Sequence, residues 1–231
     1  MNVLLWTGGK DCLFSYYKII SKGEKIDICI CLLNKDGRTF NHNLKKEIID
    51  KQADAIGMPP ILYITTPFST FSVDDYDIKE KFRMMFSLLY KLNKTMKIDN
   101  IITGQTMSEY TLLIKKACEK LKINNINPLF MHDKKASIIE FLNLGFQAII
   151  IRTESMVDKK WLGEKIDLNN KEFFEYISDK NSRFLEGFHT LVIDGPIFLK
   201  RLEIIESRPL IKDGISILDI LKIETISKLD I

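Results

Sequence analysis

Short apolar runs alternate with longer segments of helical periodicity over the first two thirds of the chain. A strand that is buried on both faces is a continuous apolar run, whereas a helix with one buried face repeats its apolar residues every three or four positions. Five apolar runs are expected to be strands: Asn2–Trp6, Ile26–Leu33, Ile61–Ile64, Ile98–Thr103 and Ala148–Arg152. This alternation predicts β-α units that build a parallel sheet.

Helices are predicted in the segments between these strands. The clearest is Glu109–Leu121, where apolar residues follow Tyr110 at i+3, i+4, i+7, i+8 and i+11 and so share one helix face. Asn43–Ile56 and Tyr76–Leu92 are predicted as further helices, and another is expected to begin near Asp11.

The pattern changes after about residue 130. The elements expected beyond this point are a helix at Ala136–Leu144, strands at Phe188–Phe198 and Lys200–Ile205, and strands or a short helix in the apolar tail Ile211–Ile231. A polar stretch, Asp158–Ser182, lies among them. The fold class is therefore α/β, with a parallel-sheet domain at 1–130 followed by a smaller α+β domain at 131–231.

Composition and charge narrow the class of protein. The chain has 231 residues, of which 45% are hydrophobic and 28% are charged, as in an ordinary globular protein. Thirty-four Lys and Arg against 31 Asp and Glu leave a charge of only +3, so no direct nucleic-acid binding is expected. No segment approaches the roughly 18 apolar residues of a membrane span.

The cysteines show no metal-ligand spacing, because Cys12, Cys29, Cys31 and Cys118 make no C-x-x-C pair. Cys29 and Cys31 lie two apart on an expected strand, where we expect them to be small buried hydrophobes. The first apolar run stops at Trp6, too early for a signal peptide. Free thiols then indicate a reducing, cytoplasmic location.

The turn after the first expected strand carries the strongest chemical signal. Thr7–Cys12, T-G-G-K-D-C, places two glycines and a lysine before a helix. Glycines let backbone N–H groups approach an anion, the helix N-terminus adds a partial positive charge, and Lys10 adds a full one. The spacing excludes a Walker A loop and a dinucleotide-binding turn. A plain turn in which Asp11 caps the helix is the alternative, and the position at a strand-to-helix crossover favours phosphate binding.

This segment resembles the S-G-G-K-D-S signature of the PP-loop ATP pyrophosphatases, enzymes that adenylate a substrate and release pyrophosphate. Thr7 keeps the hydroxyl of the first serine, whereas Cys12 replaces the last serine by a thiol, which is a weaker hydrogen-bond donor. We expect Cys12 to be a tolerated small replacement, although a helix N-terminus beside Lys10 can make a thiol reactive.

Later segments are similar to one family of this superfamily, the diphthine–ammonia ligases. Phe188–Phe198, F-H-T-L-V-I-D-G-P-I-F, is the most specific match, and Trp161–Gly163 is similar to the family's W-L-G element. The shorter similarities are Thr103-Gly104, Ser108–Tyr110 and Pro128–Phe130. The resemblance covers nearly the whole chain and implies a PP-loop, Rossmann-type first domain, with a second domain that recognises the substrate.

The family resemblance implies a reaction that consumes ATP. A substrate carboxylate attacks the α-phosphate of ATP, pyrophosphate leaves, and ammonia then displaces AMP to give an amide. In the family the carboxylate belongs to diphthine, a modified histidine of elongation factor 2. The implied cofactors are ATP and Mg²⁺, and the implied partners are ammonia and elongation factor 2; a homo-oligomer stays open.

The resemblance also assigns roles to single residues. The candidate catalytic residues are Lys10, Asp11, His189 and Thr190, and Asp11 can either hold the metal or cap the helix. The candidate nucleotide-binding residues are Thr7, Gly8, Gly9, Lys10, Asp11, Cys12 and Gly104. The candidate substrate-binding residues are Glu109, Trp161, Gly163, Glu186, Phe188 and His189. Structural roles, a satisfied histidine for His189 and a packed aromatic for Trp161, stay open.

One segment departs from the family pattern. Relatives carry G-E-x-G-E before F-H-T, whereas this chain has R-F-L-E-G at Arg183–Gly187, so both glutamates are lost, to Phe184 and Gly187. Either Glu186 replaces them after a local shift or the substrate has changed. Two alternatives follow: the same chemistry on a small carboxylate metabolite, or an ATP-binding protein that has lost catalysis.

Overall fold

The computed structural model describes residues 1–40, 42–66, 77–104, 109–212 and 214–228, without the side chains of residues 109, 110, 182, 183 and 212. The chain divides into two compact units. The first unit contains residues 1–7, 11–37 and 59–131, and the second contains residues 8–10, 38–58 and 132–231. These units interleave along the chain, and the division into domains 1–130 and 131–231 stays a prediction.

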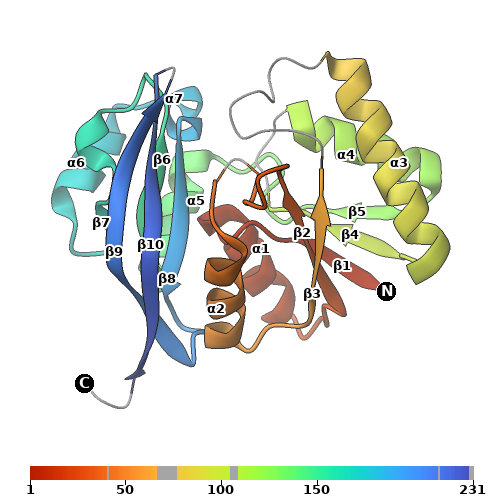
Figure 1. The fold of residues 1–231 in the computed structure, drawn as a ribbon, viewed down its shortest axis with the longest axis horizontal. Helices are drawn as coiled ribbons and strands as arrows, with labels where there is room; N and C mark the ends of the chain where they lie inside the picture. Colours follow the sequence, from red (N-terminus) through yellow and green to blue (C-terminus); the bar gives the residue numbers. More distant parts are fainter. Residues whose placement is uncertain (41, 67–76, 105–108, 213, 229–231) are drawn as a thin grey trace. The chain divides into compact units, whose positions relative to one another are not determined.

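The first unit contains a five-stranded parallel sheet; four of its strands match predicted apolar runs, whereas the fifth predicted run, Ala148–Arg152, lies in an antiparallel strand of the second unit. The strands of the parallel sheet are β1 (Asn2–Leu5), β2 (Ile28–Leu33), β3 (Ile61–Thr65), β4 (Asn100–Ile102) and β5 (Asn124–Ile126). They lie in the order β3-β2-β1-β4-β5 (Figure 1). The strand order therefore reverses at β1, and in such sheets ligands bind beyond the carboxyl ends of the strands at the point of reversal.

Helices cover both faces of this sheet. Helices α3 (Ile78–Met96) and α4 (Glu109–Leu121) lie on one face, and α1 (Lys10–Ile20) lies on the other (Figure 1). The core on the first face joins Ile30 and Ile101 of the sheet to Leu89, Ile114 and other apolar side chains of α3 and α4. In the described ranges, no helix has the length and apolar character that a membrane crossing needs.

Helix α3 is longer than its apolar pattern predicts. Asp77 caps its N-terminus by accepting hydrogen bonds from the backbone N–H groups of Lys79 and Glu80, and Lys97 ends it in a left-handed conformation. The predicted first residue, Tyr76, lies outside the described residues. The helix continues to Met96, past the predicted end at Leu92, because Leu89 and the residues around it pack on the sheet.

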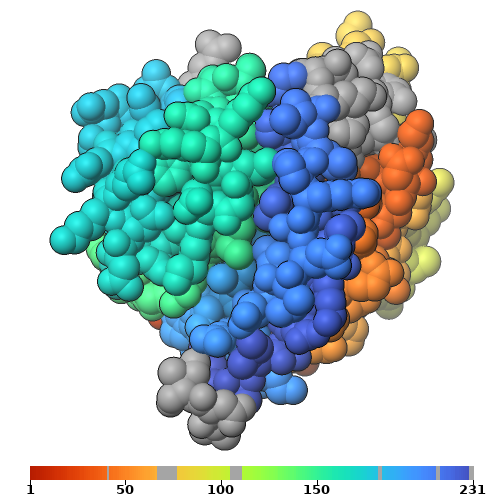
Figure 2. Space-filling model, turned by 60° about the vertical axis from the view of Figure 1, so that its left-hand side comes forward, coloured from red at the N-terminus to blue at the C-terminus, as the bar shows by residue number. Residues whose placement is uncertain are grey.

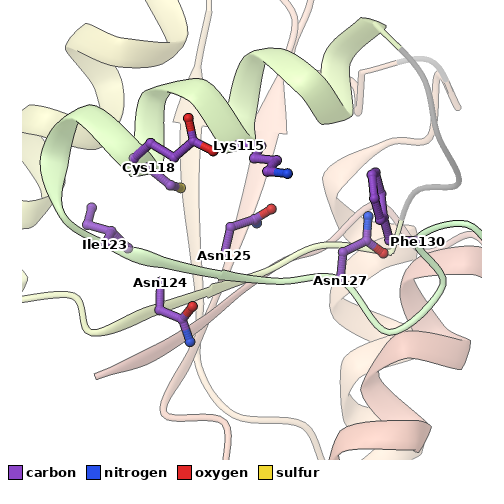
Figure 3. A pocket seen from close by; sticks show the side chains of 8 residues that line it. Lys115, Cys118, Ile123, Asn124, Asn125, Asn127 and Phe130 are labelled. Atoms are coloured by element: carbon purple, nitrogen blue, oxygen red, sulfur yellow. The ribbon is translucent and has the colours of Figure 1, made fainter.

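The sequence pattern missed β5, which is short and polar. A ladder of side-chain amides joins it to its neighbours, since Asn124 donates to Asn100 at 2.8 Å and Asn100 donates to Asn2 at 2.7 Å. Beside β5 lies a cavity of about 300 Å³, whose walls come from α4 and from the chain around β5 (Figure 3). Lys115 and Phe130 are among the side chains that line it.

The second unit contains an antiparallel sheet. Its strands are β6 (Gln147–Thr153), β7 (Lys165–Ile166), β8 (Phe188–Asp194), β9 (Lys200–Lys212) and β10 (Ile215–Ser227). Strand β6 pairs with β7, β8 and β10. Strand β10 also pairs with β9, and the two form a long hairpin, which is drawn in blue in Figure 2. The apolar tail thus forms strands, and the α/β fold class with a smaller antiparallel second part is confirmed.

Two strands of this sheet differ in length from the prediction. Strand β8 ends at Asp194 rather than Phe198, because Gly195 turns the chain so closely against Phe146 that a Cβ there would clash with the ring. Strand β9 extends to Lys212, well beyond the predicted end at Ile205, because its whole length pairs with β10.

The helices of the second unit are α2 (Lys46–Ile56), α5 (Lys134–Asn143), α6 (Lys171–Ser178) and α7 (Ser182–Glu186), with a 3₁₀ turn at Lys159–Trp161. Helix α2 packs against β9 and β10. It starts at Lys46 rather than Asn43, because Asn43 has a positive φ of 55°. Helix α6, capped by Asn170, lies within the stretch expected to be merely polar.

Candidate functional site

The glycine turn Gly8–Lys10 belongs to the second unit and is packed too tightly for larger residues. Gly8 has a φ of +81°, and a Cβ there would lie 2.8 Å from Cδ1 of Ile49. A Cβ on Gly9 would clash with Nε2 of His42. Both glycines are therefore required by the local geometry, because neither position can hold a side chain without displacing a neighbour.

Strand β8 holds this turn through two hydrogen bonds. The backbone N–H of Val192 donates to the carbonyl oxygen of Gly8 at 3.2 Å. The backbone N–H of Lys10 donates to Oγ1 of Thr190 at 3.1 Å. Two segments separated by about 180 residues, the glycine turn and the F-H-T-L-V strand, thus form one structure, and Thr190 fixes the backbone of Lys10.

Gln52 of α2 completes this connection, and the sequence interpretation missed it. Its buried side-chain amide donates to the carbonyl oxygens of Gly8 at 2.9 Å and Val192 at 2.8 Å. A signal was present, because Gln52 lies four residues from Ile48 and four from Ile56, on the apolar face of a predicted helix. A polar residue at such a position must satisfy its hydrogen bonds inside the protein.

A histidine pair lies beside the turn. The rings of His42 and His189 are 5.0 Å apart and meet edge to face at 68°. Nδ1 of His42 is 3.3 Å from the carbonyl oxygen of Phe40, which can only accept a hydrogen bond. Nδ1 therefore carries the proton, and Nε2, the nitrogen on the side of Gly9, is the acceptor in the neutral ring. His189 is thus not an isolated histidine ahead of a strand but the second residue of β8, paired with His42.

Three buried cationic side chains act on His189. Lys10, Lys134 and Arg152 are 4%, 8% and 7% exposed. Burial lowers the pKa of His189 well below its ordinary value of 6.5, and the positive charges of Arg152, Lys10 and Lys134, together with His42, lower it further. His189 is therefore neutral at pH 7 in a strongly positive environment.

The ammonium group of Lys10 lies over an aromatic ring. Its Nζ is 5.4 Å from the ring centroid of Phe188. Phe188 packs against Phe173 at 5.9 Å, and Phe173 packs against Trp161 at 5.5 Å. Trp161, which is 2% exposed, therefore supports the ring that carries Lys10 through two aromatic contacts.

The other predicted nucleotide-binding residues, Thr7, Asp11, Cys12 and Gly104, lie in the first unit. Oγ1 of Thr7 donates to Sγ of Cys12 at 3.3 Å. A Cβ on Gly104, just beyond β4, would clash with Cα of Cys12. The chain after β4 therefore lies directly on the first turn of α1, where the strand order reverses. Because α1 begins at Lys10, Asp11 lies inside its first turn rather than at the N-cap.

Three further candidate residues, Glu186, Gly163 and Glu109, are distant in sequence from the glycine turn Gly8–Lys10. Glu186, at the end of α7, has its carboxylate 3.9 Å from Nζ of Lys134. Gly163 has a φ of +88° and donates its backbone N–H to the carbonyl oxygen of Ile150, so it forms a turn beside β6. Glu109 begins α4, but its side chain, like all of Ser108, lies outside the described residues.

The cysteines are buried and reduced. Burial, with a smaller effect of Cys12, raises the pKa of the Cys29 thiol to about 12. Cys31 and Cys118 are buried as well, which confirms the expectation of small hydrophobes for the strand cysteines. Across the described ranges, no three His, Cys, Asp or Glu side chains gather into a metal site.

A five-stranded parallel sheet whose strand order reverses at β1, with helices on both faces, defines a Rossmann-like class of protein. A family model described as the diphthamide synthase N-terminal domain matches residues 1–125, and one described as the diphthamide synthase C-terminal domain matches residues 133–226. The chain belongs to the diphthamide synthase family, as the F-H-T-L-V match predicts. Membership implies a ligase-type enzyme. No curated protein matches the chain.

Proposed function

We propose that this protein is an ATP-dependent ligase that adenylates a substrate carboxylate and transfers ammonia to it, as in the conversion of diphthine on elongation factor 2 to diphthamide. One observation carries the proposal. The PP-loop turn Gly8–Lys10 is bonded to Thr190 and Val192, which belong to the strand of the family's F-H-T-L-V stretch. The two segments that specify the family therefore form one site.

The turn fits the phosphates of a nucleotide. Ile49 and His42 occupy the space that a Cβ on Gly8 or Gly9 would need, so at these two positions the turn has only backbone groups to offer to a phosphate. Lys10 supplies a full positive charge at the start of α1. Mg²⁺ would be held by Asp11 together with the phosphates, and it would neutralise negative charge during the displacement.

The reaction needs two displacements at one site. An oxygen of the carboxylate bonds to the α-phosphorus, and the bond from that phosphorus to the pyrophosphate oxygen breaks. Ammonia then bonds to the carboxyl carbon, AMP departs, and ammonia loses a proton. Lys10 holds the phosphates in place, and Thr190 positions the backbone of Lys10.

The test uses purified protein with ATP, Mg²⁺, ammonium and elongation factor 2 that carries diphthine. AMP and pyrophosphate should appear in equal amounts, together with the amidated factor. Lys10→Ala should abolish AMP formation, whereas Lys22→Ala, an exposed lysine beyond the end of α1, should not change it. Formation of ADP, or no turnover at all, would contradict the proposal.

A small carboxylate metabolite is the second candidate substrate. The altered Arg183–Gly187 segment favours it, because Phe184 replaces a family glutamate and its ring packs against Tyr176 at 5.4 Å. An aromatic contact there cannot provide the charge of a carboxylate. AMP formation with a panel of carboxylic acids, but not with the elongation factor, would select this substrate class.

A further inference from the structure

Two aromatic rings of the second unit form a corner around a lysine ammonium group. Tyr176 of α6 and Phe184 of α7 lie with their ring centroids 5.4 Å apart and their planes at 71°. Nζ of Lys180, in the short segment between the two helices, is 5.2 Å from each centroid. The three points form a nearly equilateral triangle, so both rings share one cation at a distance that allows cation–π attraction.

Contacts inside the protein hold both rings in place. The hydroxyl of Tyr176 accepts a hydrogen bond from the backbone N–H of Asp158 at 3.0 Å, and its ring packs against Trp161 at 4.8 Å. Asn181 caps α7 by accepting a hydrogen bond from the backbone N–H of Phe184 at 2.9 Å. Because none of these contacts involves the lysine, the corner should keep its shape when the lysine leaves.

Lys180 is an imperfect occupant of this corner. In the described part of the chain, its ammonium group contacts the two rings and has no carboxylate partner. A primary ammonium is strongly hydrated and carries three N–H donors, which the ring faces satisfy only weakly. A quaternary ammonium has the same charge without these donors, and aromatic rings are the side chains that recognise it. Tyr176, Phe184 and Lys180 are all half-buried, so part of each lies at the surface.

Two routes connect this corner to the candidate site within the second unit. Along α7, Phe184 lies two residues before Glu186, a candidate substrate-binding residue. Through packed rings, Tyr176 contacts Trp161, the first ring of the row on which Lys10 lies. The corner therefore adjoins residues that are expected to bind the substrate.

We infer that Tyr176 and Phe184 bind the methylated ammonium group of a ligand, and that the side chain of Lys180 occupies this place until the ligand displaces it. The flexible lysine can then extend into solvent, where its ammonium regains full hydration. Phe184 stands where family members carry a glutamate, and a ring attracts a cation through its quadrupole, without a charge of its own. That the ligand is the carboxylic acid of the adenylation reaction rests on the proposed function, and the substrate then carries both a carboxylate and a methylated ammonium group.

The experiment measures, by NMR titration, the affinity of the full chain for betaine, which joins a trimethylammonium group to a carboxylate. Two analogues are the reference ligands: tert-butylacetate keeps the shape without the positive charge, and free glycine keeps the charge without the methyl groups. Betaine should bind at least about fivefold more tightly than either analogue. The signal of its methyl protons should shift upfield, because these protons would lie over the ring faces.

Variants of the corner should change betaine binding in opposite directions. Lys180→Ala should tighten it by about 3- to 10-fold, because the group that competes for the corner is removed. Tyr176→Leu and Phe184→Leu should each weaken it by about 3- to 30-fold, whereas Tyr176→Phe keeps the ring and should stay within about twofold. A gain in affinity cannot result from unfolding, so Lys180→Ala keeps the test decisive where a ring variant loses its fold.

Two neighbouring residues provide matched controls. Lys160→Ala removes an ammonium that lies over the single ring of Trp161, at 5.0 Å, and Phe174→Leu removes another half-buried ring of α6. Both variants should bind betaine as the unmodified protein does. Equal affinity for betaine and its two analogues, or unchanged betaine affinity in Lys180→Ala and in both ring variants, would overturn the inference.

The outcome also separates this site from the proposed function. Ring-dependent betaine binding in a protein that forms no AMP from any carboxylic acid would sustain the cation site and reject the proposed reaction. AMP formation that is equal in the unmodified protein, in Tyr176→Leu and in Phe184→Leu would sustain the proposed reaction and reject a role of the corner in substrate binding.

Discussion

The side-chain amide of Gln52 donates a 2.9 Å hydrogen bond to the carbonyl oxygen of Gly8, in the first half of the phosphate turn. The same nitrogen donates to Val192 of β8 at 2.8 Å. One buried side chain therefore joins the turn to the strand that carries His189, and the position of Lys10 depends on a residue that carries no charge and matches no motif.

Replacement of this amide should damage both stability and nucleotide binding. Gln52→Leu keeps the volume but removes two buried hydrogen bonds, those to the carbonyl oxygens of Gly8 and Val192, so we expect a loss of about 1–3 kcal/mol in the free energy of unfolding. The turn should also relax, with about tenfold weaker ATP binding. Urea denaturation and calorimetry measure the two effects. Gln147→Leu, at the start of β6, is the control, and a Gln52→Leu variant with normal ATP affinity would contradict this role.

Gly104 should tolerate replacement by alanine as poorly as Gly8 and Gly9 of the turn. A Cβ at this position would collide with Cα of Cys12, a backbone atom that cannot move aside without shifting α1. Gly104→Ala should therefore weaken ATP binding by at least about tenfold. Gly23→Ala is the control: its φ of +79° strains an alanine, but no atom lies within 4 Å of the added Cβ. Equal ATP affinity in the two variants would argue against the close approach at Gly104.

Four strands of the parallel sheet could be predicted from sequence because they are short apolar runs, most fully buried in β2 and β4. Strand β5 escaped detection because asparagine amides, not apolar side chains, join Asn124 to Asn100. Helix α6 escaped because only Phe173 and Ile177 of its eight residues are buried, which is too few to produce a clear period.

The candidate site was only half visible in the sequence. Lys10, His189 and Thr190 could be predicted as candidate site residues, because the family resemblance covers those positions. His42, Lys134 and Arg152 carry no such signal, since an isolated histidine, lysine or arginine is usually a surface residue. Their importance depends on burial and on cross-strand pairing with β8, and neither is encoded by local spacing.

A buried ion pair should make the second unit sensitive to a single neutral substitution. Asp219 of β10 is 2% exposed and pairs with Arg38 at 3.0 Å and Arg208 at 3.2 Å. Asp219→Asn removes the buried carboxylate charge beside Arg38, which is 24% exposed, and we expect a loss of about 1–3 kcal/mol in the free energy of unfolding. Glu224→Gln on the same strand is the control. Its ion pair with Lys222 is exposed, so its loss should leave the urea midpoint nearly unchanged. Similar urea midpoints for Asp219→Asn and Glu224→Gln would contradict the predicted difference in stability.

The neutral state of His189 should make the folded protein less stable in mild acid. The folded-state pKa lies well below the ordinary value of 6.5, so between these two pKa values the unfolded chain binds a proton that the folded chain does not. The free energy of unfolding should therefore fall as the pH decreases below about 6.5, by up to about 1.4 kcal/mol per pH unit from this residue.

Urea denaturation between pH 7.5 and 5, roughly the range in which histidines rather than carboxylates titrate, measures this slope. His189→Asn should flatten it, because asparagine does not titrate. A slope that is the same with and without His189 would assign the acid sensitivity to other groups.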